Sequence, residues 1–363
     1  MEADALASVK AKNGDNMTIR PPASDGIDYS ASAPLVQGDE ATCSIGRFDF
    51  EAGGVLEEMT VGYVTHGALN ARRDNAILLL PGTANTRHSA DGYIGPGKVF
   101  DTTTYFIVAV DAIGAGTSSK PSDSLGARFP AYNVRDMVRA ELAMIQAVFG
   151  ITRLRAVAGA SMGSFQALEW SVMYPEMVDR SILIVPAARA GQVFKSIVAT
   201  ATQAVQLDPL WNGGQYSSQP VAGLRLAGSI YYPWTVTDAW IEGVAPERLE
   251  AEAASTVERA AQWDAWDFLK RYQASASHDV SQPFGGDMAK ALASVQAPTL
   301  VMPSATDRLL PVEAARQMAQ GIRHATYAEI PGNRGHLAWR AVDGSPESAF
   351  VSDNIARFLG KGD

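Results

Sequence analysis

The stretch Val157-Ala158-Gly159-Ala160-Ser161-Met162-Gly163 decides the fold. It has the pattern Gly-x-Ser-x-Gly, with an apolar, strand-like run over 154–158 before it and a helix-like run over 164–174 after it. Strand, serine, helix is the order typical of a sharp turn that presents a nucleophilic serine. Glycines two residues before and after the serine suit so tight a turn, because a Cβ at either position would clash. The sequence therefore predicts Ser161 as a nucleophile.

Apolar runs alternate with amphipathic segments on both sides of this motif. Strands are predicted over 76–80, 105–111, 154–158, 181–186, 298–302 and 326–330, and helices over 134–149, 164–174, 311–321 and 351–359. Wholly apolar strands that alternate with helices are typical of a parallel sheet covered on both faces. Residues 43–69 suggest antiparallel strands, with apolar residues alternating with polar ones. The fold class is therefore α/β, with a mostly parallel, doubly wound sheet.

The pattern changes between residues 190 and 290. This segment reads as helical, is rich in Ala and Gln, and contains many aromatic residues. We expect an inserted helical cap over 190–290, an α/β core over 41–189 and 291–363, and a flexible, polar arm over 1–40.

Bulk composition excludes several classes of function. The chain has 363 residues and a net charge of −9, without a Lys/Arg cluster, which argues against a nucleic-acid partner. No apolar run approaches the roughly 20 residues that span a bilayer, and the first residues lack the pattern of a signal peptide. The single cysteine, Cys43, rules out an internal disulfide and disfavours a cysteine-based metal site. We expect a soluble, cytoplasmic protein without a membrane partner.

Partners for Ser161 lie in the last α/β segment. Asp307 follows the predicted strand 298–302, and His336 follows the predicted strand 326–330. Both loops are at the carboxyl ends of strands, in the chain order serine, acid, histidine that this kind of sheet requires. Taken alone, Asp307 reads as a solvated carboxylate beside Arg308 and His336 as a surface histidine. Their joint occurrence behind the serine motif favours a triad.

An acyl-transferring serine also needs two donors for the oxyanion. The backbone N–H of Met162, at the start of the helix after the turn, is one candidate. The second is expected in the loop after the strand 76–80, and we predict the N–H of Thr83. His88 and Ser89, further along the loop, are expected to support its structure or to line the pocket.

With these residues in place, the chain resembles the homoserine O-acetyltransferase family of α/β-hydrolases. The stretches that carry the resemblance are Ile94-Gly95-Pro96-Gly97-Lys98-Val99-Phe100-Asp101-Thr102, Asn133-Val134-Arg135-Asp136-Met137-Val138, the segment GASMGSFQALEW at 159–170, Asp208-Pro209-Leu210-Trp211-Asn212-Gly213-Gly214, and Thr306-Asp307-Arg308-Leu309-Leu310-Pro311. The resemblance implies the α/β-hydrolase fold, the triad of Ser161, Asp307 and His336, a helical cap, and commonly a homodimer through the cap.

The departures from this family concern the substrate. Where the acetyltransferases have an arginine that holds the homoserine carboxylate, this chain has Gly228, and a supporting tyrosine falls near Thr235. An aspartate that receives the substrate ammonium is replaced by Leu337. A zwitterion in a desolvated pocket needs a counter-charge at each end, so we expect an apolar pocket that includes Gly228, Leu337, Tyr231 and Trp234. Arg225 is the alternative cation for a carboxylate.

These observations predict a serine carboxylic-ester hydrolase that acts on short-chain, acetyl-type esters of an uncharged alcohol through an acyl-Ser161 intermediate. The reaction requires no metal and no bound cofactor, and the only predicted partner besides the second subunit is the small-molecule ester. The alternative is an acetyl-CoA-dependent O-acyltransferase with homoserine or another alcohol as acceptor, which shares every catalytic residue. A non-catalytic receptor of the same fold is a third possibility, disfavoured because all three triad members are present.

Overall fold

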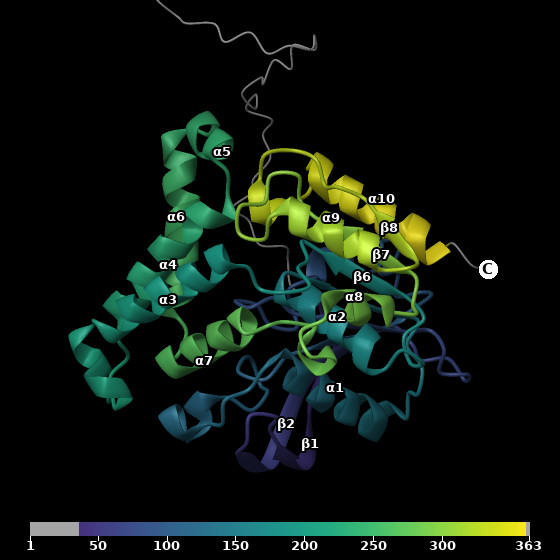
Figure 1. Ribbon diagram of the computed structural model, residues 1–363, viewed down its shortest axis with the longest axis horizontal. Helices are drawn as coiled ribbons and strands as arrows, with labels where there is room; N and C mark the ends of the chain where they lie inside the picture. Colours follow the sequence, from purple (N-terminus) through teal and green to yellow (C-terminus); the bar gives the residue numbers. More distant parts are fainter. Residues whose placement is uncertain (1–35, 361–363) are drawn as a thin grey trace, which may run out of the picture.

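The computed structural model describes residues 36–360, which form an eight-stranded sheet in the order β1-β2-β4-β3-β5-β6-β7-β8 (Figure 1). The strands are β1 Asp39–Asp49, β2 Val55–His66, β3 Ala76–Leu80, β4 Phe106–Val110, β5 Ala156–Ala160, β6 Ser181–Ile184, β7 Thr299–Met302 and β8 Ala325–Tyr327. Strands β1 and β2 pair antiparallel, β2 joins β4 antiparallel, and every other pair is parallel. The predicted α/β fold with a mostly parallel sheet is confirmed.

Helices and loops bury both faces of this sheet. In β3, Leu78 and Leu80 face the cluster formed with α1 (Val134–Phe149), α2 (Met162–Met173) and α9 (Val312–Gly321). Ile77 and Leu79 face the second cluster, which α10 (Pro346–Gly360) and the loop around Ile94 complete. Alternate residues of a strand point to opposite faces, so a strand covered on both sides must be apolar throughout. This explains the wholly apolar runs of the central strands.

The segment between β6 and β7 forms helices α3 Gln192–Gln206, α4 Val221–Thr235, α5 Asp238–Gly243, α6 Pro246–Ala261, α7 Ala265–Ala276 and α8 Met288–Ala293. In Figure 1, α3 to α6 stand at the left of the sheet, and α7 returns the chain toward it. Helix α4 packs along both α3 and α6. These helices rise beside the edge of the sheet at which the parallel strands end, where ligands of such sheets bind.

The predicted N-terminal arm over 1–40 lies almost entirely outside the described residues. Its last two residues, Asp39 and Glu40, already belong to β1, so the boundary at residue 40 is two residues too late. Among the helices of the described part of the chain, none has both the length and the apolar character needed to cross a bilayer.

Candidate active site

Ser161 occupies the tight turn between β5 and α2. Its φ of 57° and ψ of −124° lie outside the ordinary regions for an L-residue. A Cβ added to Gly159 would lie 2.4 Å from the carbonyl carbon of Gly163, and one added to Gly163 would lie 2.2 Å from the carbonyl oxygen of Leu80. Both distances are shorter than any permitted contact, so the two glycines are what allows the strained turn to form.

The side chains of Ser161, His336 and Asp307 form one hydrogen-bonded chain. The His336 Nε2 lies 3.0 Å from the Ser161 Oγ, and its Nδ1 lies 2.7 Å from the Asp307 Oδ2. The other carboxylate oxygen, Oδ1, accepts the backbone N–H groups of Leu309 at 2.8 Å and Leu310 at 2.9 Å. The Asp307 carboxylate is therefore fixed on both sides and holds the imidazole in one orientation.

The loops that carry Asp307 and His336 are joined directly. The Thr306 hydroxyl donates to the carbonyl of Gly332 at 3.2 Å and accepts the N–H of Gly335 at 3.3 Å. Because Thr306 precedes the aspartate and Gly335 precedes the histidine, these bonds fix the relative position of the two side chains. The structure thus brings together the three residues that the sequence predicts.

The two predicted oxyanion donors lie on either side of the turn. Met162 is the first residue of α2, and the first N–H groups of a helix have no partner within it. The Thr83 N–H lies in the loop after β3 and meets no acceptor among the described residues. The Thr83 hydroxyl is 2.9 Å from the hydroxyl of Ser275 on α7. Both N–H groups are thus available to an oxyanion at Ser161.

Arg271 of α7 holds the loop that contains Thr83. Its fully buried guanidinium donates to five carbonyl oxygens, those of Gly82, Thr83, Asn85, Ala112 and Ile113, at 2.6–3.2 Å. Burial lowers the pKa of the Arg271 guanidinium. Sequence reasoning missed this residue because an arginine in an amphipathic helix usually reads as a solvated side chain. An arginine thus links the cap to the predicted oxyanion loop.

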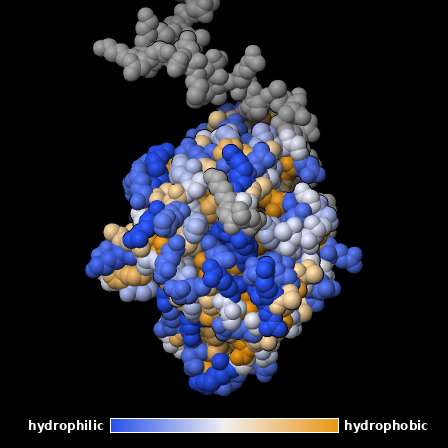
Figure 2. Space-filling model, turned by 90° about the vertical axis from the view of Figure 1, so that its right-hand side faces the viewer, coloured by the Kyte–Doolittle hydropathy of each residue, from blue (hydrophilic) through white to orange (hydrophobic). Residues whose placement is uncertain are grey.

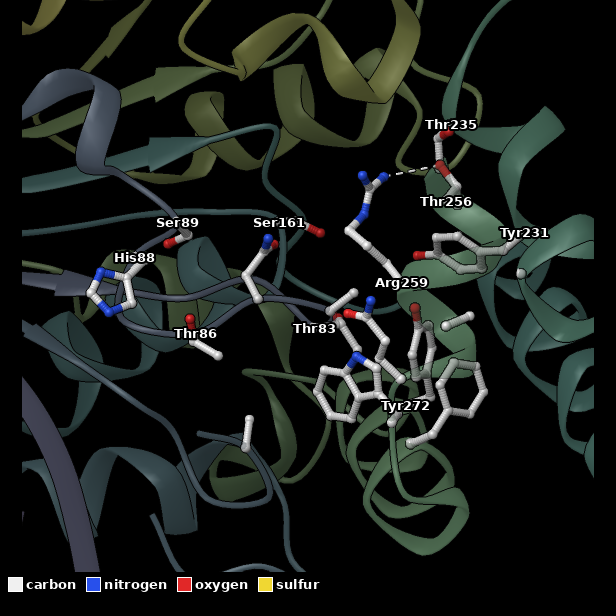
Figure 3. A pocket seen from close by; sticks show the side chains of 18 of the residues that line it. Thr83, Thr86, His88, Ser89, Ser161, Tyr231, Thr235, Thr256, Arg259 and Tyr272 are labelled. Carbon is white, nitrogen blue, oxygen red and sulfur yellow. Dashed lines mark hydrogen bonds between the residues drawn. The ribbon is translucent and has the colours of Figure 1, made fainter. Parts of the chain in front are cut away.

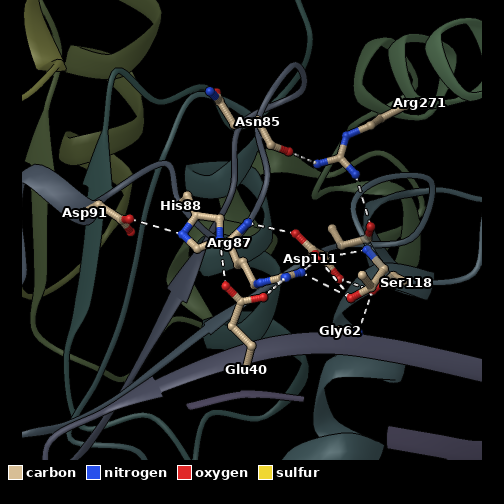
Figure 4. A network of polar contacts seen from close by, with 11 residues as sticks. Glu40, Gly62, Asn85, Arg87, His88, Asp91, Asp111, Ser118 and Arg271 are labelled. Atoms are coloured by element: carbon tan, nitrogen blue, oxygen red, sulfur yellow. Dashed lines mark hydrogen bonds and ion pairs between the residues drawn. The ribbon is translucent and has the colours of Figure 1, made fainter. Parts of the chain in front are cut away.

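A second polar network supports the same loop from the side of β1 and β2 (Figure 4). Arg87 forms ion pairs with Glu40 and with the fully buried Asp111. The Asp111 carboxylate also accepts the Arg87 N–H at 2.8 Å and the Thr117 N–H at 3.0 Å. His88, one residue further, has its Nδ1 3.1 Å from the Asp91 carboxylate. The network fixes the backbone between the Thr83 turn and the first residues of the Ile94 loop.

Above Ser161 lies a cavity of about 630 Å³ between the core and the cap (Figure 3). Its walls include predicted residues from both parts of the chain, namely Thr83, His88, Ser89, Ser161, Gly228, Tyr231, Thr235, His336 and Leu337. Trp234 does not line this cavity, contrary to the prediction. The indole of Trp234 instead packs under the Arg308 guanidinium, whose central carbon lies 5.3 Å from the ring centroid of the indole.

Gly228 marks the close contact between α4 and α6. A Cβ at this position would lie 3.0 Å from the Cβ of Ala260 and 3.0 Å from the Cα of Val257. Helix α6 therefore fills the space that a longer side chain at 228 would need. The alternative cation Arg225 is exposed and pairs with Glu258, with nitrogen–oxygen distances of 3.0 and 3.1 Å. Another arginine, Arg259 of α6, lines the cavity instead.

Within residues 36–360, no group of three or more His, Cys, Asp or Glu side chains is arranged to hold a metal ion. The polar groups directly at Ser161 are its hydroxyl, the His336 imidazole and the backbone N–H groups of Met162 and Thr83. This set suits acyl transfer through a covalent intermediate.

Comparison with known proteins agrees with this geometry. A family model described as the alpha/beta hydrolase fold matches residues 75–338. The chain belongs to the α/β-hydrolase family. Within this family, a probable esterase of Corynebacterium glutamicum is 33% identical over 326 residues, which cover 85% of this chain and 93% of that protein. The homoserine O-acetyltransferase of Thermobifida fusca is 35% identical over 320 residues, covering 77% of this chain and 84% of that enzyme.

A solved structure has the same overall fold. An acetylester hydrolase from Corynebacterium glutamicum superposes on this α/β-hydrolase with a TM-score of 0.84 and 29% identity, covering 88% of this chain and 96% of the other. The predicted resemblance to homoserine O-acetyltransferases and related esterases is confirmed. Esterases and acetyltransferases both occur among the relatives, which supports an enzyme.

Proposed function

We propose that this α/β-hydrolase is a serine carboxylic-ester hydrolase that acts on short-chain acyl esters through an acyl-Ser161 intermediate. The observation that carries the proposal is the hydrogen-bonded chain from Ser161 through His336 to Asp307 at the floor of the cavity. The relatives described as a probable esterase and an acetylester hydrolase support it.

The proposed reaction proceeds in two halves. The Ser161 Oγ attacks the ester carbonyl while His336 takes its proton, and the N–H groups of Met162 and Thr83 bind the oxyanion. The bond to the alcohol oxygen then breaks, and the alcohol leaves with the proton from His336. Water, deprotonated by His336, attacks the acyl-serine, and the carboxylic acid leaves while Ser161 regains its proton. Asp307 holds the imidazole and stabilises its charged form.

In the described part of the chain, the carboxylates in the wall of the cavity already accept hydrogen bonds from neighbouring residues. Two carboxylates, Asp264 and Asp267, line it. Asp264 caps α7 and accepts the hydroxyl of Tyr216 at 2.7 Å, and Asp267 accepts the hydroxyl and N–H of Ser122 at 2.6 and 2.8 Å. Leu337 lies where the acetyltransferases resembled by this chain have an aspartate. We therefore propose esters whose alcohol carries no amine.

A second candidate is an acyltransferase that passes the acyl group from acetyl-CoA to an alcohol. The 35% identical homoserine O-acetyltransferase favours it, because the acylated serine is common to both reactions. Homoserine itself is disfavoured as acceptor, since α6 occupies the space beside Gly228.

Hydrolysis of p-nitrophenyl acetate and propyl acetate by the wild-type protein tests the proposal, with thiol release from acetyl-CoA measured with and without alcohols. We expect ester hydrolysis that Ser161→Ala lowers by a factor of about 10⁴ or more. Acetyl-CoA turnover that needs an alcohol, without ester hydrolysis, would instead support the acyltransferase. Full activity in Ser161→Ala would contradict both.

We also propose that the protein forms a homodimer through the cap. Of the large apolar side chains exposed within the described residues, four lie on or between α3 and α4, namely Val193, Leu207, Leu210 and Leu226. Leu207 is 81% exposed. On the face shown in Figure 2, at the right of Figure 1, hydrophobic residues are interspersed with hydrophilic ones. The concentration of exposed apolar side chains in this part of the cap supports an interface between subunits.

A further inference from the structure

Two arginines line the cavity that contains Ser161. Arg259 belongs to α6 of the cap, and Arg340 follows the helical turn Gly335–Trp339 that carries His336. Figure 3 shows the Arg259 side chain extending from its helix into the cavity, with its guanidinium between that helix and Ser161 in this view. The two residues also line a smaller hollow beside the cavity. Besides Lys120, which pairs with Asp123, the cavity wall thus carries two arginines from separate elements.

Neither arginine has an acidic partner among the described residues. The Arg259 guanidinium donates to the hydroxyl groups of Ser255 at 2.6 Å and Thr256 at 3.0 Å, both on its own helix and both uncharged. The Arg340 guanidinium forms no hydrogen bond or ion pair within residues 36–360. The exposed Arg225, in contrast, pairs with Glu258 in two hydrogen bonds.

The acids in the walls of the cavity and of the smaller hollow already accept hydrogen bonds from other groups. Glu252, which lines the smaller hollow, accepts the Arg334 guanidinium at 2.9 and 3.2 Å and lies 3.6 Å from Arg248. The Asp264 and Asp267 carboxylates are held by neutral donors, as described above. Within the described residues, no carboxylate therefore forms an ion pair with Arg259 or Arg340, although Asp264 and Asp267 line the same cavity.

Two guanidinium groups without an ion-pair partner cost free energy in the protein without a bound ligand. Burial, followed by the charges of Arg259 and Arg334, lowers the pKa of Arg340 to about 10, and the charge of Glu252 offsets only part of this shift. Arg259 also has a lowered pKa because of burial, although its side chain is open to the water of the cavity. Both groups stay charged near pH 7. A bound anion would relieve the repulsion, and hydrogen bonds from a guanidinium to a carboxylate are among the strong ones.

We propose that Arg259 and Arg340 bind a carboxylate carried by the substrate ester, away from the carbonyl that Ser161 attacks. This inference rests on the proposed function, because it defines the substrate class of the same site. It also revises the expected apolar pocket. The cation absent at Gly228 is supplied from the facing helix, one residue from the Ala260 that fills the space beside that glycine. The preferred ester is an anion without an amine.

Two pairs of esters test the proposal. In the first pair, acetoxybutanoate carries a free carboxylate on the alcohol part of the ester, and its methyl ester does not. In the second pair, monomethyl succinate carries a free carboxylate on the acyl part, and dimethyl succinate does not. We expect the wild-type protein to prefer the anionic member of at least one pair by roughly 10-fold or more in kcat/KM. In the double variant Arg259→Met/Arg340→Met, the ratio should fall to near one.

Arg225→Met is the matched control, because it removes an arginine from the same cap outside the cavity, and it should keep the wild-type ratio. The ratio is insensitive to partial unfolding, which lowers both rates together. Equal rates for charged and neutral esters in the wild-type protein would overturn the anion site while leaving the proposed hydrolase intact.

Binding of the same esters to Ser161→Ala, measured by calorimetry, separates the two proposals. If the wild-type protein hydrolyses neither member of a pair but Ser161→Ala binds the anionic one more tightly, the hydrolase proposal fails and the anion site stands. If binding shows no preference and the double variant binds like its parent, the anion site is overturned.

Discussion

Gly163 packs directly against the carbonyl oxygen of Leu80, at the point where α2 leaves the serine turn beside the end of β3. A Cβ on Gly163 would lie 2.2 Å from this oxygen, and the neighbour is backbone that cannot rotate away. We expect Gly163→Ala to lower the free energy of unfolding by about 1–3 kcal/mol or more, and to reduce activity because Ser161 shifts with the turn.

Urea denaturation with activity assays checks this prediction. Gly360→Ala is the control, since a Cβ at the end of α10 meets nothing within 4 Å. Equal denaturation midpoints for the two variants would show that the turn tolerates a side chain, and that the contact with Leu80 is not what requires glycine.

Arg271 is predicted to be a positioning residue for the oxyanion loop. Replacing it with Lys leaves one donor group in place of a guanidinium that reaches five carbonyl oxygens. We expect kcat to fall about 100-fold, as when an oxyanion donor is misplaced, with a smaller change in KM. Fluorophosphonate labelling of Ser161 should slow in parallel.

Lys270, which precedes Arg271 in the chain, provides the control for Arg271→Lys. Lys270→Met removes a side chain that donates to the carbonyl of Phe129 and does not touch the loop after β3. Its kcat should stay close to that of the wild-type enzyme. A loss of stability in Arg271→Lys without a change in kcat would assign Arg271 a purely structural role.

Glu141 predicts a pH dependence of stability. This buried carboxyl on α1 accepts the Trp170 indole N–H at 2.7 Å, and burial raises its pKa from 4.5 to about 8. Between these values the folded state keeps a proton that the unfolded state has lost. The free energy of unfolding should therefore decrease as the pH rises from about 5 to 8, by at most about 1.4 kcal/mol per pH unit for one group.

Glu141→Gln should reduce this slope, because the amide mimics the protonated carboxyl at every pH. Burial raises the pKa of Glu169 to about 8 as well, so part of the slope should remain. Urea denaturation at several pH values measures the effect, with the exposed Glu250→Gln as a control that keeps the wild-type slope. An unchanged slope in Glu141→Gln would contradict the prediction.

The proposed dimer interface gives a further prediction. Leu207→Asp and Leu226→Asp place a charge on the exposed apolar surface of the cap, and desolvating that charge in an interface is costly. Sedimentation should show a dimeric wild-type protein and a monomeric double variant. The control variant Val148→Asp changes an exposed residue of α1, outside the cap, and this variant should remain a dimer. A monomeric wild-type protein would refute the interface.

The features that sequence could predict are those with a local signature. The central strands are apolar throughout because both faces are buried, and Gly159 and Gly163 stand at fixed distances from Ser161 for a steric reason. The sequence predicts Asp307 and His336 because each follows a strand, so the topology of the sheet alone brings their loops together.

Other residues depend on contacts that no local pattern encodes. Arg271 lies 188 residues from Thr83 in the chain, and only the packed structure shows that its guanidinium is enclosed by carbonyl groups. Arg259 belongs to an amphipathic helix, where an arginine is typical of the solvated face. Tyr231 and Trp234 both belong to α4. Tyr231 lines the cavity and Trp234 packs against Arg308, and this difference depends on how α4 packs on its neighbours.

The guanidinium of Arg271 has a consequence for how substrates reach Ser161. Since α7 belongs to the cap segment and its arginine is enclosed by the loops after β3 and β4, a cap that swung open at each turnover would dismantle the oxyanion site and strand five carbonyl groups. We therefore expect substrate and product to pass through an opening that does not change during turnover. The width of this opening, rather than a hinged motion of the cap, would then limit the size of the esters that enter.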